Sequence, residues 1–213
     1  STPLYSSAAS DVYKRQIDVV LVTYNFAMEG RIDPLLQSLD VAGLGVVAMK
    51  VMAGSFGMDP SYDYQGSRQR LKRSGAPAAA LRYVLRNRHV HCAIPSITDM
   101  DQLDENVRAM SVPFTEADKK LLASQLEHIR PLYCRMCGEC AGACPKGLPV
   151  ADMLRYLTYA EGYGQYALGR EHWTALPPTL KDVRCDLCPA CSVKCPYGVQ
   201  VQQRLGRAQE LFA

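Results

Sequence analysis

Short apolar runs alternate with amphipathic segments over residues 17–131. Three of these runs are rich in β-branched side chains and are expected to form strands, at residues 17–24, 44–54 and 89–96. Continuous apolar character of this kind is typical of strands buried in a parallel sheet. The second run ends in a glycine-containing loop, so its strand is expected to be shorter than the run.

The segments between these runs carry apolar residues at helical spacing. Four helices are expected, at residues 33–43, 76–88, 99–110 and 114–131. Thr98 or Asp99 is a candidate N-cap for the third helix, and Thr115 for the fourth. Residues 58–75 are polar and predict a loop with a short helical piece. Strands alternating with helices predict an α/β fold with a parallel sheet and right-handed crossovers.

The pattern changes beyond residue 131, where helices are expected without strands. Residues 148–180 predict a helix, a glycine-containing break, a second helix and a Pro-Pro stop, and residues 198–213 predict a further helix. Four tyrosines at helical spacing are expected to serve packing rather than redox chemistry: Tyr156, Tyr159, Tyr163 and Tyr166. Two domains are therefore expected, at residues 17–130 and 131–213.

Eight of the nine cysteines form one spacing pattern that occurs twice. The copies are Cys134, Cys137, Cys140 and Cys144 before Pro145, and Cys185, Cys188, Cys191 and Cys195 before Pro196. This spacing is that of bacterial [4Fe–4S] ligation, in which the fourth cysteine binds the other cluster. Crossed ligation would place one cluster on Cys134, Cys137, Cys140 and Cys195, and a second on Cys185, Cys188, Cys191 and Cys144.

Zinc sites and disulfides are the alternatives to iron–sulfur clusters. Structural zinc sites usually pair Cys-x2-Cys units that lie far apart, without a third cysteine at the same interval. Disulfides require an oxidising compartment, and the sequence begins without a secretory hydrophobic region. The duplicated motif therefore favours two [4Fe–4S] clusters over two four-cysteine zinc sites or four disulfides.

Composition and charge narrow the class of protein. The chain has 213 residues, 48% hydrophobic and 21% charged, with a formal net charge of +3, which is too small to predict nucleic-acid binding. Its apolar runs are shorter than a membrane span. Together with the metal-type cysteine pattern, these features predict a protein of the reducing cytoplasm that interacts with neither nucleic acid nor membrane.

The first sixteen residues, "STPLYSSAASDVYKRQ", have little apolar periodicity and no functional motif. Residue for residue, they match the translation of a transposase-type sequencing adapter. Residues 1–16 are therefore expected to be non-native, with natural sequence starting near Ile17 inside a longer gene, and they are excluded from fold reasoning. On this interpretation the chain is a C-terminal fragment.

The helical layout around the cysteines resembles the α-helical ferredoxin, in which helices carry two crossed clusters. The stretches "VLVTYN", "GVVAMKVMAG", "PAAALRYVLRN" and "CAIPSITDMDQLDENVRAM" resemble the last three β–α units of an aldo-keto reductase. Together, the two parts resemble the aldo-keto reductase family that carries a C-terminal iron–sulfur domain. The resemblance implies an incomplete (β/α)8 barrel at residues 17–130, followed by an all-α two-cluster ferredoxin-like domain at 131–213.

The resemblance also implies part of a nicotinamide cofactor site, NAD or NADP. The candidate residues are Lys50, Ser96, Thr98, Gln102, Glu105 and Asn106. Hydroxyls and amides beside a helix N-terminus suit phosphate and ribose groups, although Thr98 or Asp99 could merely cap the helix, with Gln102 in solvent. Many NADP-preferring members have Lys or Arg where this chain has Ser96 and Gln102. The choice between the two cofactors therefore stays open.

The resemblance assigns no catalytic residue here, because the family's Asp, Tyr, Lys and His belong to the first half of the barrel. Four histidines are expected at core edges or on the surface: His89, His91, His128 and His172. Cys92 is expected to be a small buried residue. The intact protein is expected to be an oxidoreductase acting on a small carbonyl substrate. Alternatively, it is an electron-transfer module that serves a redox partner protein, with the barrel as scaffold.

Overall fold

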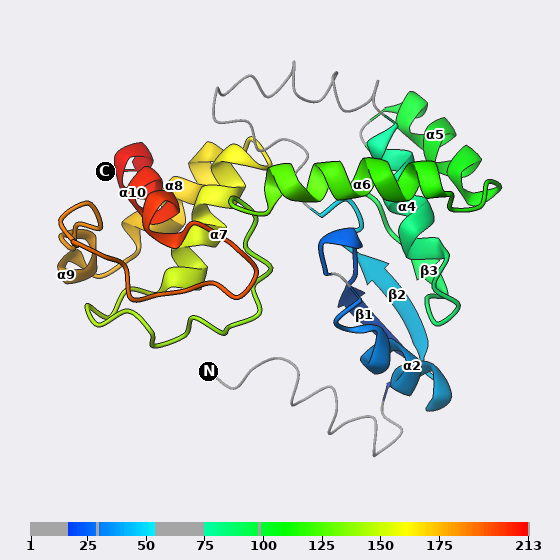
Figure 1. The fold of residues 1–213 in the computed structure, drawn as a ribbon, viewed down its shortest axis with the longest axis horizontal. Coiled ribbons are helices and arrows are strands. Elements are labelled where there is room, and N and C mark those ends of the chain that lie inside the picture. Colours follow the sequence, from blue (N-terminus) through cyan, green and yellow to red (C-terminus); the bar gives the residue numbers. More distant parts are fainter. Residues whose placement is uncertain (1–16, 29, 54–74, 98, 213) are drawn as a thin grey trace. The chain divides into compact units, whose positions relative to one another are not determined.

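The computed structural model describes residues 17–28, 30–53, 75–97 and 99–212 (Figure 1). The described residues form two compact units, one from residues 17–53 and 75–123, the other from residues 124–212. The division falls inside helix α6 (Glu116–Ile129), and the boundary expected from the sequence, after residue 130, lies just beyond that helix. The adapter-like segment, most of the predicted polar loop and Thr98 lie outside the described residues.

The first unit contains a parallel sheet of three strands in the order β1-β2-β3. The strands are β1 (Val19–Thr23), β2 (Gly45–Met49) and β3 (Cys92–Ala93). The register pairs Leu21 with Val47 and Val47 with Cys92. The predicted parallel sheet is therefore confirmed, while the third strand is much shorter than the apolar run that predicted it.

β3 is a short strand at the edge of the described sheet. The ladder to β2 includes Ile94 N–H, which donates to Ala48 O at 2.9 Å. Pro95 follows, and the N–H that it lacks would have pointed away from β2, so proline is tolerated there as on other edge strands. β2 ends because Lys50 turns into the left-handed region, with φ 54°. Apolar character alone therefore does not set where either strand ends.

The helices of the first unit agree closely with the sequence pattern. The described elements are the 3-10 turn η1 (Phe26–Met28) and the helices α2 (Asp33–Val41), α4 (Ala76–Leu85) and α5 (Met100–Met110), followed by α6. Asp99 caps α5 by accepting a hydrogen bond from Gln102 N–H at 2.9 Å. Thr115 caps α6, where its hydroxyl oxygen accepts from Asp118 N–H at 3.2 Å. Both predicted capping positions are confirmed, the first in favour of Asp99.

The two faces of the sheet differ in burial. On one face, Val46 is fully buried, and α2 and α4 contact β2 and β3. On the other face, Val19 and Leu21 are 56% and 52% exposed. Cys92 shares the exposed face, because the register aligns it with Leu21 through β2. The expectation that Cys92 is buried is therefore wrong.

The second unit is helical in its described part. Its helices are α7 (Val150–Glu161), α8 (Tyr166–Thr174), α9 (Pro178–Lys181) and α10 (Val201–Phe212). The glycine-containing break between α7 and α8 and the final helix occur where the pattern predicted them. The short helix α9 was not expected; it begins at the second residue of Pro177-Pro178, where proline is tolerated in a first turn.

Helices α7, α8 and α10 pack around one apolar core (Figure 1). Leu157, Trp173 and Phe212 are among its buried members. Tyr156 stacks on His172 with ring centroids 5.2 Å apart, which places this tyrosine in the packing between α7 and α8. In the described part of the chain, none of the helices combines the length and apolar character needed to cross a membrane.

Candidate metal centre

The two cysteine motifs lie in loops beside the core of the second unit. The first loop joins α6 to α7, and the second joins α9 to α10. All eight motif cysteines are free thiols, and Cys185 is buried while the other seven are partly exposed. Cys134, Cys140 and Cys185 are among those that pack against or belong to the apolar core. The loops therefore bring thiols to the edge of a hydrophobic cluster, where water is partly excluded.

Left-handed backbone positions curve the first loop. Met136 has φ 55° and Gly138 has φ 80°. The chain therefore turns sharply once within each of the first two Cys-x2-Cys intervals. Met136 N–H donates to the Cys134 sulfur at 3.4 Å, and Ala141 N–H donates to Gly138 O at 2.8 Å. A left-handed non-glycine residue costs conformational energy, which marks Met136 as a strained position beside the first thiol.

The second loop has its own turn and one link to the first. Cys188 N–H donates to Cys185 O at 3.3 Å, which closes the Cys-x2-Cys turn. The Ser192 hydroxyl donates to Ala143 O at 3.4 Å, so a side chain of the second motif contacts the backbone of the first. This contact brings the C-terminal part of each motif beside the other.

The electrostatic surroundings of Cys134 identify its neighbouring thiols. Burial is the main cause that raises the pKa of Cys134 to about 11, and nearby thiols raise the pKa further. Those thiols are Cys140, Cys137 and Cys195. The pKa of Cys140 is likewise raised by burial first and then by Cys137 and Cys195. Three cysteines of the first motif are thus grouped with the last cysteine of the second.

Cys185 has the reciprocal surroundings. Burial is the main cause that raises its pKa to about 11, followed by the thiols of Cys188, Cys144 and Cys191. Lys146 acts in the opposite direction and lowers the pKa. Three cysteines of the second motif are therefore grouped with the last cysteine of the first. The two groups of four are the sets that crossed ligation requires.

The fit of these groups to a metal centre rests on their donor chemistry. Thiolates are the ligands that iron–sulfur clusters and structural zinc use, and each group supplies four. Among the described residues, however, no set of three or more His, Cys, Asp or Glu side chains is arranged to hold one metal ion. The eight motif cysteines fit two four-thiolate centres in donor type and in grouping. Their side chains would have to move closer together when a metal binds.

The candidate nicotinamide-binding residues belong to the first unit, whereas the two cysteine motifs belong to the second. Ser96 is exposed in the segment after β3, and Asn106 is 9% exposed on α5. Gln102 Nε2 donates to the Asp99 carboxylate at 2.7 Å, and the same carboxylate accepts from Gln102 N–H. A negative side chain therefore already occupies the N-terminus of α5, which disfavours a phosphate at that place. Gln102 is partly exposed and bound to the capping carboxylate, which agrees with the alternative in which Asp99 merely caps the helix.

Lys50 follows β2 with its backbone held in place. Asn25, which is fully buried, donates from Nδ2 to Lys50 O at 3.0 Å, and its Oδ1 accepts from Ala27 N–H at 3.0 Å. Asn25 thus links the C-terminal ends of β1 and β2, the edge of a parallel sheet where ligands usually bind. The sequence analysis did not single out Asn25, because a lone asparagine after a strand carries no spacing signal.

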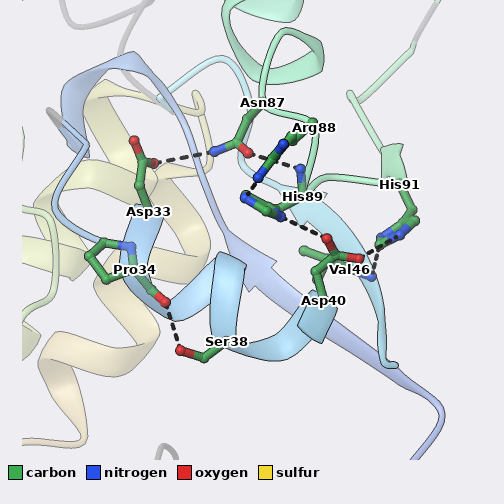
Figure 2. A network of polar contacts seen from close by, with 9 residues as sticks. All are labelled: Asp33, Pro34, Ser38, Asp40, Val46, Asn87, Arg88, His89 and His91. Atoms are coloured by element: carbon green, nitrogen blue, oxygen red, sulfur yellow. Dashed lines mark hydrogen bonds and ion pairs between the residues drawn. The ribbon is translucent and has the colours of Figure 1, made fainter. Parts of the chain in front are cut away.

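A second polar cluster joins α2 to the segment before β3 (Figure 2). The carboxylate of Asp40 lies 2.7 Å from His89 Nδ1 and 3.3 Å from His91 Nε2. His91 Nδ1 accepts from Val46 N–H at 3.0 Å, so in the neutral ring Nε2 carries the proton and donates to Asp40. Hydrogen bonding from His89 is the main cause that lowers the pKa of Asp40. His89 is partly buried and His91 is exposed, in agreement with the expected places at a core edge or on the surface.

Comparison with protein-family models, curated proteins and solved structures finds no match to this chain. The candidate site therefore depends on the chain's own residues. Two of those residues, Gln202 and Gln209 on α10, hold the second cysteine loop but were not expected from the sequence. Their separation of seven residues, two helical turns on one face, is the signal that could have identified them.

Proposed function

We propose that this chain is part of an iron–sulfur oxidoreductase resembling the aldo-keto reductases, with two [4Fe–4S] clusters in its second unit. The observation that carries the proposal is the grouping of eight free thiols into two crossed sets of four. A repeated Cys-x2-Cys-x2-Cys-x3-Cys-Pro spacing and the reciprocal exchange of the fourth cysteine support the same ligand assignment.

In this proposal the first unit is the last three β–α units of a (β/α)8 barrel. Its parallel strand order and the buried asparagine at the carboxyl ends of β1 and β2 support a ligand site at that edge. The second unit is a helical two-cluster domain in which α7, α8 and α10 form the core. When bound, the clusters would supply one-electron transfer.

A second candidate function is favoured by the capping of α5. The Asp99 carboxylate binds the first-turn N–H of Gln102 and the Gln102 side chain, which opposes a cofactor phosphate there. A nicotinamide also delivers two electrons as hydride, whereas each cluster accepts one. The alternative is an electron-transfer module in which the first unit is a scaffold and the second passes electrons to a partner protein.

Metal and sulfide analysis tests the cluster assignment directly. We expect the chain, expressed and purified without oxygen, to contain about eight iron and about eight acid-labile sulfide, with broad absorption at roughly 400 nm. Two zinc ions without sulfide would identify structural zinc sites and contradict the proposal.

A nicotinamide titration separates the two candidate functions. Binding of NADH or NADPH to the cluster-loaded protein, followed by intrinsic fluorescence, supports the oxidoreductase. Asp99→Asn removes the negative charge at α5 while keeping a capping oxygen, so it should strengthen any binding there. Because this chain carries only part of the proposed cofactor site, absence of binding favours the electron-transfer module only when it is found with the complete barrel.

A further inference from the structure

Two glutamines of α10 hold the backbone of the second cysteine loop. Gln209 Oε1 accepts a hydrogen bond from Cys185 N–H at 3.0 Å, and Gln202 Nε2 donates to Cys185 O at 3.1 Å. The same Gln202 nitrogen donates to Cys188 O at 2.9 Å. Both backbone groups of Cys185 and the carbonyl group of Cys188 are thus bound by side chains from one helix.

The arrangement is buried and directional. Gln209 is only 5% exposed, and its Nε2 also donates to Val183 O, so both ends of its amide are used within the fold. Gln202 and Gln209 are separated by two helical turns and therefore lie on one face of α10. Buried amides of this kind rigidify what they bind, because an unmade hydrogen bond would leave a desolvated polar group.

These bonds constrain the geometry of the thiols through the backbone. One nitrogen that binds the carbonyl groups of both Cys185 and Cys188 fixes the two residues relative to each other, in addition to their own turn. It also keeps both carbonyl oxygens directed at α10. The backbone positions of two ligands of one predicted centre are therefore set by a helix that contributes no thiol.

We infer that Gln202 and Gln209 are positioning residues for the centre formed by Cys185, Cys188, Cys191 and Cys144, and not for the other centre. This inference rests on the proposed function. Groups that orient metal ligands from outside the ligand set typically change metal affinity by about tenfold to a hundredfold when they are removed. The expected consequence is a selective loss of one centre.

The test measures iron release to a ferrous chelator from the anaerobically purified full chain. In Gln202→Met the side chain keeps its length but loses both donors, and about half of the iron should leave roughly tenfold faster or more. Gln202→Glu should accelerate release further, because a carboxylate facing two carbonyl oxygens repels them. Gln209→Met removes the acceptor for Cys185 N–H and should likewise accelerate release of about half of the iron.

Matched controls separate positioning from general stability. Gln203→Met changes the same residue type at the exposed neighbouring position and should release iron at the wild-type rate. Cys188→Ser and Cys137→Ser provide reference electron paramagnetic resonance spectra, each for a chain that keeps one centre. After partial chelation of Gln202→Met, the remaining signal should match that of Cys188→Ser. Circular dichroism of each metal-free variant checks that its helices are intact.

The possible outcomes are distinguishable. Selective release with intact helices supports the inference. Equal acceleration of all iron, or wild-type release in both Gln202 variants, overturns it while the proposed function stands. A wild-type chain that contains no sulfide overturns the proposed function, and this inference with it.

Discussion

The thiols of Cys134 and Cys185 are held mostly in the neutral form near pH 7 when no metal is bound. Burial raises the pKa of Cys134 and of Cys185 from 9.0 to about 11. Metal ligation requires thiolates, so binding must release protons and is weakened by acid. The residue that best tests crossed ligation is Cys144, which belongs to the first motif in sequence but is electrostatically grouped with Cys185.

Replacing Cys144 with serine should damage the centre of Cys185, Cys188 and Cys191 more than that of its sequence neighbours, because it removes one of that group's four thiols. Electron paramagnetic resonance of the reduced protein should retain the signal assigned with Cys188→Ser. Cys92→Ser, outside both motifs, should leave both signals unchanged. Loss of the neighbouring centre instead would show that ligation is not crossed.

At the scale of elements, the start of α6 is stabilised by a reciprocal cap and a buried ion pair. Thr115 N–H donates to Asp118 Oδ2 at 2.9 Å, which completes a capping box with the Thr115 hydroxyl. Arg82 of α4 binds both oxygens of the same carboxylate. This pair links two helices that are distant in sequence, and both side chains are largely buried.

Asp118→Asn should lower the free energy of unfolding by about 3 kcal/mol, because it leaves the Arg82 charge without a buried partner. Hydrogen bonding from Arg82 is the main cause that lowers the folded-state pKa of Asp118 below its ordinary value of 3.8. The ionised Asp118 carboxylate therefore stabilises the folded state fully above about pH 4, and this contribution is lost as the pH falls through the folded-state pKa of Asp118. Urea unfolding measured at several pH values should show that the free energy of unfolding depends less on acid pH in Asp118→Asn than in the unsubstituted chain.

The exposed pair of Glu116 and Lys119, 3.5 Å apart on the same helix, provides the control. Glu116→Gln should change stability by less than about 0.5 kcal/mol. A similar small effect of Asp118→Asn would mean that the ion pair with Arg82 contributes little.

The contact between α7, α8 and α10 depends on one glycine. A Cβ atom at Gly169 would lie 2.6 Å from Tyr156 O and 2.9 Å from Phe212 Cζ. Gly169→Ala should therefore destabilise the second unit by about 1–3 kcal/mol, through overpacking against backbone that cannot move freely. Thermal unfolding followed at the helical circular dichroism band measures the effect.

Gly206 on α10 is the matched position, because a Cβ atom there meets no atom within 4 Å. Gly206→Ala should stabilise the protein by up to about 1 kcal/mol, since alanine favours the helix. Equal effects of the two substitutions would contradict the close approach at Gly169.

At the scale of the whole molecule, the first unit presents an apolar sheet face. Leu21 and Val19 are more than half exposed on it, whereas parallel sheets are normally covered on both faces. Leu21→Thr should lower the binding of a hydrophobic dye and reduce self-association without lowering stability by more than about 0.5 kcal/mol. Val46→Thr, on the buried face, should destabilise instead. A large stability loss for Leu21→Thr would mean that this face is covered in solution.

The element types could be predicted from the sequence to a large extent. Alternating apolar runs predicted a parallel sheet, and the capping residues Asp99 and Thr115 marked the helix starts. The length of β3 could not be predicted from apolar character alone, because the apolar run extends beyond the two residues that pair with β2. Burial of Cys92 was predicted wrongly, since one strand's composition does not show which face of a sheet is covered.

The candidate site, like the fold, could be predicted from the sequence only in part. Local spacing predicted eight cysteines as ligands, because ligands two residues apart can be placed by one short loop, and the bacterial [4Fe–4S] pattern predicted their crossed assignment to two sets. Only the tertiary structure placed Gln202 and Gln209 on the second loop. Those contacts join residues up to 24 positions apart. Periodicity and spacing determine what a segment forms by itself, while contacts across the fold depend on how the chain packs.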